Sequence, residues 1–321
     1  MVTSSQTSIA RLARSAAVPT LVLVQFFALL GVAQAQTPSA LFAAPHVTTA
    51  AAPAGMPAVT AAVGGQAVRP PPPAAAPQPV PTPQIACGAP ADFTHFDRPL
   101  LRTMARLASG EPLTIVAIGS SSTAGAGASS PAASYPSRLA VELKQRFPGH
   151  DITVINRGIN GEETDQMMAR FDTGVIAEHP QLVLWQVGTN SVLRDRPLDR
   201  HTEQLREGID RLKATGADVV LIDLQFAPAV IAKSETPAMV EQIALAAKER
   251  NIDLFRRFAV MRNWREDQHL SFNDFVAPDS LHMNDWGYGC LAKLLAVAIS
   301  DAATRPVTSA AAHPARTPNS P

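Results

Sequence analysis

The chain has 321 residues, with 27 Lys and Arg against 27 Asp and Glu, two Cys, 28 Pro and 5% aromatic residues. This length allows one or two domains, and the lack of net charge argues against nucleic-acid binding, which needs a basic surface. Two Cys exclude a zinc ribbon and a cysteine-dense secreted miniprotein.

Residues 1–35 have the three parts of a secretory signal peptide. Arg11 and Arg14 precede an apolar run at residues 18–32, which ends at an Ala-Gln-Ala site at residues 33–35. We predict cleavage after this site and export, either to the periplasm or out of the cell. The run is shorter than the ~20 residues of a bilayer-spanning helix, so we expect no membrane span in the cleaved chain. An uncleaved membrane anchor is the alternative.

Residues 36–86 are predicted to be a disordered linker. They hold 12 Pro, including four in a row at residues 70–73, and their composition is dominated by Ala, Pro, Val, Thr and Gln. Such a segment lacks the side chains that offset chain entropy, and its Pro content makes it a semi-rigid spacer. Residues 303–321 have a similar composition and are predicted to be a disordered tail.

Residues 87–302 are predicted to form one α/β domain. Five apolar runs indicate buried strands, at residues 113–118, 152–155, 182–187, 219–224 and 252–255. Between them the apolar residues follow helical spacing, as in Leu139, Leu143 and Phe147. Thr236 and Pro237 are predicted to be the N-cap and first turn of a later helix. Alternating buried strands and helices indicate a parallel sheet covered on both faces, a three-layer α/β sandwich.

Polar clusters follow four of these runs, at residues 119–125, 156–161, 188–191 and 279–282. The carboxyl ends of the strands carry the chemistry in such sheets, so we expect the four clusters to meet at one edge. The first cluster lacks the Gly-Lys-Ser/Thr ending of a phosphate loop and the glycine spacing of a dinucleotide site. We therefore predict no nucleotide cofactor.

Asp279 and His282 are spaced so that the carboxylate can reach one imidazole nitrogen. The other nitrogen is then free to take a proton from a serine hydroxyl, which activates a poor nucleophile. A helix N-terminal acid beside a surface histidine is the plainer alternative for this pair alone. His269 is the only further candidate metal ligand nearby, so we predict no metal site.

Acyl transfer through a serine also needs hydrogen-bond donors for the oxyanion. The side-chain amide of Asn190 and the backbone N–H groups of Ser121 and Gly161 are the candidates. Each of these residues alone has a structural explanation, as part of a turn or loop. The presence of all four clusters after successive strands favours a catalytic site.

The blocks Gly119-x-Ser121-x-Thr123, Asn156-x-Gly158-x-x-Gly161, Gly188-Thr189-Asn190 and Asp279-x-x-His282 resemble the four-block pattern of SGNH hydrolases, the GDSL esterase/lipase superfamily. The resemblance implies a flavodoxin-like α/β/α sandwich of about five parallel strands. It also implies Ser121 as nucleophile, His282 as general base, Asp279 as its orienting acid, and Ser121, Gly161 and Asn190 as oxyanion-hole donors.

Two residues depart from this pattern, because Ser120 and Ser191 stand where the family often has Asp. The resemblance implies a serine esterase, with a small acetyl ester of a glycan slightly favoured over a lipid ester. An acyltransferase on the same fold and a non-catalytic tethered binding domain are the alternatives. Residues 226–235 and 261–278 are the expected pocket walls. Trp264, Phe272 and Phe275 are candidates to stack on a sugar or flank an acyl chain, and cover for the sheet edge is the equal alternative for them.

Cys87 and Cys290 are expected to be bonded, because two Cys in an exported chain pair more often than in a cytosolic one. Such a bridge would join the start of the domain to its last helix. Two independent thiols are the alternative, and the sequence leaves the oligomeric state open.

Overall fold

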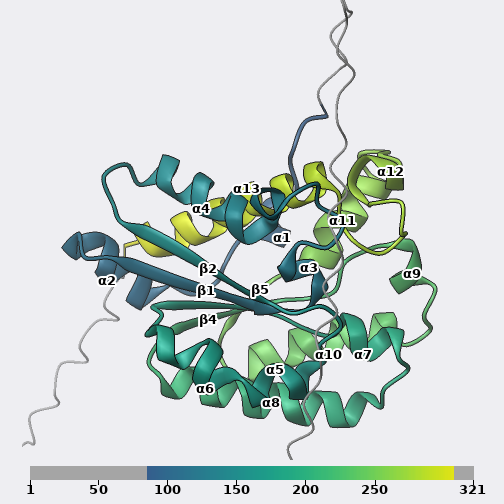
Figure 1. Cartoon of the computed structure of the whole chain (residues 1–321), viewed down its shortest axis with the longest axis horizontal. Helices are drawn as coiled ribbons and strands as arrows, with labels where there is room; N and C mark the ends of the chain where they lie inside the picture. The colour runs from purple at the N-terminus through teal and green to yellow at the C-terminus, as the bar shows by residue number, and fades with distance from the viewer. Residues whose placement is uncertain (1–84, 307–321) are drawn as a thin grey trace, which may run out of the picture. The chain divides into compact units, whose positions relative to one another are not determined.

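The computed structural model describes residues 85–306 (Figure 1). The predicted signal peptide, most of the predicted linker and nearly all of the predicted tail lie outside the described residues. Five strands form one parallel sheet in the order β2-β1-β3-β4-β5. Their bounds are Leu113–Gly119 (β1), Ile152–Gly158 (β2), Leu182–Gln186 (β3), Asp218–Ile222 (β4) and Asp253–Phe255 (β5). The predicted number of strands is confirmed.

Helices cover both faces of this sheet. Their bounds are Ala91–Thr94 (α1), Leu101–Ser109 (α2), Ser121–Ala124 (α3), Tyr135–Arg146 (α4), Thr164–Ala169 (α5), Phe171–Gly174 (α6), Thr189–Leu193 (α7), Leu198–Ala214 (α8), Pro228–Ile231 (α9), Thr236–Glu249 (α10), Arg257–Glu266 (α11), Phe272–Phe275 (α12) and Asp285–Thr304 (α13). Two short 3₁₀ helices span Pro131–Ala133 (η1) and Ile176–Glu178 (η2). None of the helices within residues 85–306 has the length and apolar character needed to span a membrane.

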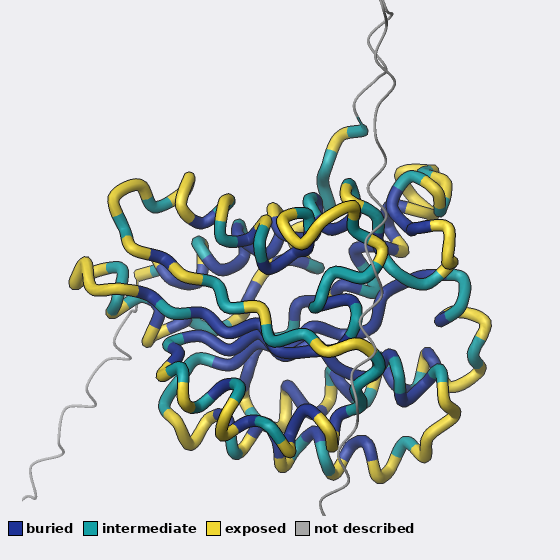
Figure 2. Tube along the Cα trace, viewed as in Figure 1, coloured by how far each residue is buried: buried dark blue, intermediate teal, exposed yellow. Residues whose placement is uncertain are grey.

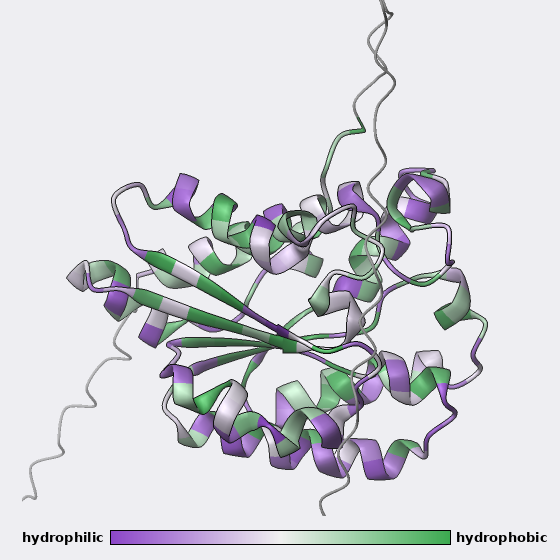
Figure 3. Cartoon of the chain, viewed as in Figure 1, coloured by the Kyte–Doolittle hydropathy of each residue, from purple (hydrophilic) through white to green (hydrophobic). Residues whose placement is uncertain are grey.

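The core forms two layers because successive strand residues point to opposite faces. Ile115 and Ala117 pack with α4, α11 and α13, whereas Val116 and Ile118 pack with α5, α6, α8 and α10. All four side chains are fully buried. Strands β1, β3 and β4 are accordingly buried in Figure 2 and largely hydrophobic in Figure 3, while the outer helix surfaces are exposed and more polar. The edge strand β2 is half-buried or exposed along most of its length. The predicted three-layer α/β/α sandwich is confirmed.

The strand order places a switch point between β1 and β3. The chain passes from β1 to β2 on one side and later returns to β3 on the other side of β1. In open parallel sheets the crevice beyond the carboxyl ends at such a point is where ligands bind. Both strands lead directly into predicted site clusters, at Ser121 and Asn190.

Two helix boundaries differ from the sequence prediction. Thr236 is the first residue of α10 and not its N-cap, which is Glu235. The Thr236 hydroxyl donates instead to the carbonyl of Val230, at 2.6 Å. At the other end of the domain, α13 continues to Thr304, so the folded part extends past the predicted boundary at residue 302.

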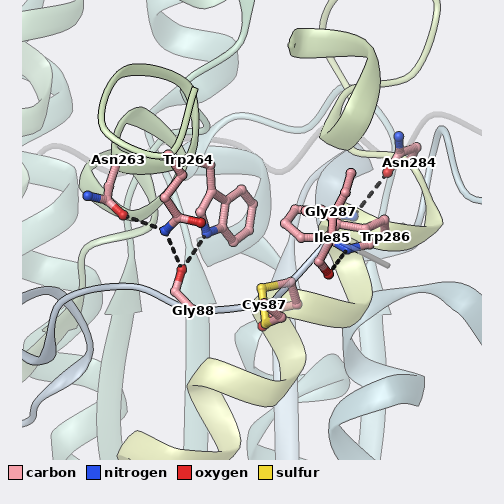
Figure 4. The surroundings of a disulfide bond; sticks show 10 residues. Ile85, Cys87, Gly88, Asn263, Trp264, Asn284, Trp286 and Gly287 are labelled. Atoms are coloured by element: carbon pink, nitrogen blue, oxygen red, sulfur yellow. Dashed lines mark hydrogen bonds between the residues drawn. A yellow bond between two sulfur atoms is a disulfide. The ribbon is translucent and has the colours of Figure 1, made fainter. Parts of the chain in front are cut away.

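Cys87 and Cys290 form a disulfide bond that joins the start of the folded part to α13 (Figure 4). Hydrogen bonds hold the same segment in place on both sides of the bond. The indole N–H of Trp286 donates to the carbonyl of Ile85 at 3.3 Å, and that of Trp264 donates to the carbonyl of Gly88 at 2.9 Å. Ile85, which belongs to the predicted linker, therefore lies against the domain.

Candidate active site

The predicted nucleophile lies on a tight turn between β1 and α3. Ser121 is the first residue of α3, and Ser120 precedes it in a non-helical conformation. The N–H and hydroxyl of Ser120 both donate to the side-chain oxygen of Gln186 on β3, at 2.9 and 3.0 Å. The serine found where the family often has Asp is thus buried and hydrogen-bonded to the neighbouring strand.

Gly158 allows this turn to pack directly against the end of β2. A Cβ atom added at Gly158 would lie 2.1 Å from the backbone nitrogen of Ala124. The three atoms nearest to that position all belong to the backbone of the α3 turn, which cannot move aside as a flexible side chain can. Any larger residue there would displace the turn that holds Ser121.

A buried charge lies behind the turn. The guanidinium of Arg257 is fully buried and donates to the hydroxyl of Ser122 at 2.9 Å. Burial lowers the pKa of Arg257 to about 10, against the opposing effect of Asp223, so the group stays protonated at neutral pH. Burial raises the pKa of Asp223 to about 7, although the Phe258 N–H and Arg257 act to lower it. Arg257 could not be identified from local sequence, because its contact with Ser122 spans 135 residues.

The structure brings the three predicted catalytic side chains into one hydrogen-bonded chain. The Nε2 atom of His282 lies 2.8 Å from the Ser121 hydroxyl oxygen, and its Nδ1 atom lies 2.6 Å from an Asp279 carboxylate oxygen. With Nδ1–H donating to the carboxylate, Nε2 has a free lone pair for the serine proton. This is the geometry of an activated serine nucleophile.

The Asp279 carboxylate is held by its own loop as well as by the imidazole. Its second oxygen accepts the backbone N–H groups of Leu281 and His282, at 3.0 and 2.9 Å. Burial acts to raise the pKa of Asp279, but the hydrogen bonds from His282 and these N–H groups outweigh it and lower the pKa. The carboxylate is therefore ionised when the imidazole needs an orienting partner. It is not the N-terminal acid of α13, which begins at Asp285 with Asn284 as its cap.

Two of the predicted oxyanion donors, Gly161 and Asn190, lie on segments that contact each other. Gly161 has a φ of +78°, a left-handed conformation that favours glycine. The side-chain nitrogen of Asn190 donates one of its two N–H groups to the carbonyl of Glu162, at 2.8 Å. Within the described residues, no hydrogen bond occupies the backbone N–H of Ser121 or Gly161. These two groups and the second Asn190 N–H are available to an oxyanion.

An ion pair missed by the sequence analysis holds the oxyanion loop. The Arg170 guanidinium donates to both carboxylate oxygens of Glu162 at 2.9 Å and to the Arg157 carbonyl at 2.8 Å. Both side chains are mostly buried. The loop is also tied to the nucleophile turn, because the Ile159 N–H donates to the carbonyl of Gly119 at 3.0 Å. The Glu162–Arg170 pair therefore fixes the loop that carries Gly161 and anchors Asn190.

The two predicted pocket walls contribute to a cavity that none of the predicted catalytic or oxyanion residues lines. Its volume is about 810 Å³, and its lining includes Phe226, Ile231 and Arg262. That these segments form the substrate pocket therefore stays a prediction. Trp264 and Phe275 are fully buried in the core and cannot stack on a ligand. Phe272 is partly buried and stacks on Phe226, with ring centroids 5.9 Å apart. No group of three His, Cys, Asp or Glu side chains within residues 85–306 is arranged to hold a metal.

Comparison with known proteins identifies the family of the chain. The profile of the non-GDSL lipase-like family matches residues 86–305. An arylesterase from Vibrio mimicus is 36% identical over 95 residues, which cover 30% of this chain and 46% of that protein. The match thus spans about half of the length of that relative.

Solved structures share the fold at low identity. A two-domain esterase active on acetylated mannans aligns with a TM-score of 0.59 and 21% identity, over 71% of this chain and 60% of that one. A variant of Axe2, an acetyl xylan esterase from Geobacillus stearothermophilus, aligns with a TM-score of 0.51 and 22% identity, over 58% and 94% of the two chains. From the extent of the profile match and the four blocks at the sheet edge, the chain belongs to the non-GDSL lipase-like family of the SGNH/GDSL lipase and esterase superfamily.

Proposed function

We propose that the protein is an exported serine esterase that removes small acyl groups, above all acetyl, from a glycan. The observation that carries the esterase activity is the continuous contact from Ser121 through His282 to Asp279, at 2.8 and 2.6 Å. A domain that only binds a ligand, or one that has lost its catalytic activity, does not need this alignment of an ionised carboxylate, an imidazole and a hydroxyl.

The first half of the reaction forms a seryl ester. The Ser121 hydroxyl oxygen attacks the ester carbonyl carbon while Nε2 of His282 takes its proton. The negative charge that develops on the carbonyl oxygen is stabilised by the Ser121 and Gly161 N–H groups and the Asn190 amide. The protonated imidazole then donates its proton to the leaving oxygen as the carbon–oxygen bond breaks, and the alcohol departs.

The second half releases the acid. Water attacks the seryl ester and gives a proton to Nε2 of His282, and the same three donors stabilise the second oxyanion. Collapse of this intermediate returns the proton to the Ser121 oxygen and frees the carboxylic acid. The Asp279 carboxylate remains ionised throughout and orients the imidazole.

The glycan substrate is supported by the substrates of proteins that share the fold. The two solved structures aligned above act on acetylated mannans and on acetyl xylan, respectively.

Export is supported by the signal-peptide pattern of residues 1–35 and by the Cys87–Cys290 disulfide, a bond typical of oxidising compartments. The mass of the mature protein tests export, with an N-terminus at Gln36 as the expected result.

A chain-length series of aryl esters tests the esterase activity. Wild type, Ser121→Ala and Ser130→Ala proteins are assayed with p-nitrophenyl acetate, butyrate and octanoate. Ser130 is exposed and makes no side-chain hydrogen bond within the described residues, so it is a matched control. We expect Ser121→Ala alone to lose several orders of magnitude in kcat, with acetate the best substrate.

Retention of full activity by folded Ser121→Ala would overturn the catalytic scheme. Preference for octanoate would favour a lipid ester over an acetylated glycan. Product analysis with an added sugar acceptor separates hydrolysis from acyl transfer, because both reactions use the same three side chains.

A further inference from the structure

A second cavity, separate from the catalytic serine, lies beside the oxyanion loop. It has a volume of about 270 Å³ and lies between the start of α5, α7 and the first turns of α8. We call it the Ser191–His201 pocket. The residues that matter for its chemistry are Glu163, Asp165, Ser191, Arg196, Arg200 and His201.

The pocket shares its wall with the oxyanion hole. Glu163 directly follows Glu162, whose carbonyl holds the Asn190 amide, and Ser191 directly follows Asn190. Arg194 bridges the two regions. One of its terminal nitrogens donates to Glu163 at 2.7 Å. The other is close to Gly161, because a Cβ atom added at that glycine would lie 3.4 Å from it. The segments that carry Gly161 and Asn190 therefore continue directly into the lining of this pocket.

The pocket contains a buried imidazole without a partner. His201 is 3% exposed, and neither ring nitrogen makes a hydrogen bond within the described residues. Burial lowers the pKa of His201 to about 4, so the ring is neutral at pH 7 and offers one N–H donor and one lone pair. The Thr164 hydroxyl, between the lining residues Glu163 and Asp165, is also buried without a partner. A buried polar group left unpaired is unfavourable, so a ligand that supplies the missing hydrogen bonds would be stabilised here.

The charges of the lining favour a neutral ligand. Glu163 and Asp165 balance Arg196 and Arg200, and Arg196 already donates to Glu163 at 3.0 Å. There is thus no excess positive charge to select an anion. A neutral imidazole with one donor and one acceptor matches a hydroxyl group, which can accept and donate at once.

The size and polarity of the pocket point to a ring with several hydroxyl groups. Its volume is far larger than the ~30 Å³ that one water occupies in the liquid, and its named lining is polar, which does not suit an acyl chain. Ser191 contributes to this space, because it is smaller and uncharged where the family often has Asp. It is also almost fully buried, at 4% exposed.

We propose that the Ser191–His201 pocket is a binding subsite for a sugar residue of the glycan, next to the residue whose ester is cleaved. The proposal rests on the proposed function, since it assigns a specificity subsite to that same active site. The His201 ring and the Arg200 guanidinium are its predicted contacts to sugar hydroxyl groups.

Kinetics on large and small substrates test the subsite. His201→Phe keeps an aromatic ring and removes both ring nitrogens, and Arg200→Ala removes an exposed contact with little risk to folding. Arg206→Ala is the matched control, because Arg206 lies on the same helix but pairs with Glu249 away from the pocket. Each mature protein is assayed with acetylated mannopentaose, acetylated xylotetraose and p-nitrophenyl acetate.

For each protein, kcat/KM on the better oligosaccharide is divided by kcat/KM on p-nitrophenyl acetate. We expect His201→Phe and Arg200→Ala to lower this ratio about tenfold, mainly because KM for the oligosaccharide rises. The Arg206→Ala ratio should equal that of wild type. An unchanged ratio in folded His201→Phe and in Arg200→Ala would overturn the proposal and leave the pocket as a site for water only.

A binding measurement separates failure of the subsite from failure of the esterase. Titration of Ser121→Ala protein with unmodified mannopentaose and xylotetraose needs no turnover. We expect one of the two to bind, and the His201→Phe substitution in this background to weaken that binding about tenfold. Absence of binding by either sugar would refute the subsite, whatever the result with aryl esters. Binding without any ester hydrolysis would support the subsite and refute the proposed activity.

Discussion

The substitution Glu162→Gln tests whether a mostly buried ion pair sets the geometry of the oxyanion hole. The change keeps the size of the side chain and removes its charge. In wild type, Arg170 donates three hydrogen bonds to the Glu162 carboxylate. The substitution removes the negative charge that strengthens them. Each bond of this kind contributes about 1.5–3 kcal/mol, so the cost is enough to shift a short loop.

The shift acts on catalysis through two donors at once. Glu162 follows Gly161, and its carbonyl receives the Asn190 amide at 2.8 Å. Loss of one oxyanion donor costs about 10²–10³ in kcat, and we expect Glu162→Gln to reach the lower end of this range. KM should change little, because the donors act mainly on the transition state.

Steady-state kinetics with p-nitrophenyl acetate measure both constants, and a thermal melt establishes that the variant is folded. Glu249→Gln is the control, since Glu249 pairs with Arg206 through two hydrogen bonds on the surface. In an Asn190→Ala background, Glu162→Gln should add much less than it does alone. A folded Glu162→Gln protein with wild-type kcat would refute the reasoning.

Three further outcomes are expected. Asn190→Ala should lower kcat about 10²–10³-fold with the fold intact, and a smaller effect than about fivefold would remove its role as a donor. Replacing Cys87 and Cys290 by Ser should lower the free energy of unfolding by about 5 kcal/mol, because the bond closes a loop with a sequence separation of 203; urea unfolding that shows no loss would contradict this. For Asp223, the folded pKa of about 7 exceeds the unfolded value of ~3.9. Its contribution to stability is therefore greatest below pH 4 and is lost as the pH rises toward 7. In wild type, this titration should lower the free energy of unfolding by at most about 4 kcal/mol between pH 4 and pH 7. The Asp223→Asn protein should lack this fall, as measured by urea unfolding of both proteins across the interval. Equal pH slopes would exclude the raised pKa.

The arrangement of the catalytic side chains could be anticipated because the required information is local. Asp279 and His282 are three residues apart, and Ser121 and Asn190 each follow the end of a strand. The parallel sheet then brings the ends of its strands to one edge. The buried strands could be predicted equally well, since residues such as Ile115 and Val183 belong to short, continuous apolar runs.

The supporting contacts could not be read in the same way. Arg257 meets Ser122 across 135 residues, and Ser120 meets Gln186 across 66. Arg and Gln side chains of this kind are common on protein surfaces, and nothing in their local sequence marks them as buried partners. The roles of Trp264 and Phe275 were open for the same reason, because the local sequence around an aromatic residue does not show whether its side chain faces a ligand or the core.

The sequence by itself therefore determined the α/β class, the four blocks and the pairing of Asp279 with His282, because periodicity and short spacings are properties of the chain. Tertiary structure alone decided which charges brace the site and which polar groups stay unpartnered. The Glu162–Arg170 pair and the pocket at His201 depend on which helices pack against which strand ends. That packing minimises exposed apolar area over the whole domain, and no local segment of the sequence contains it.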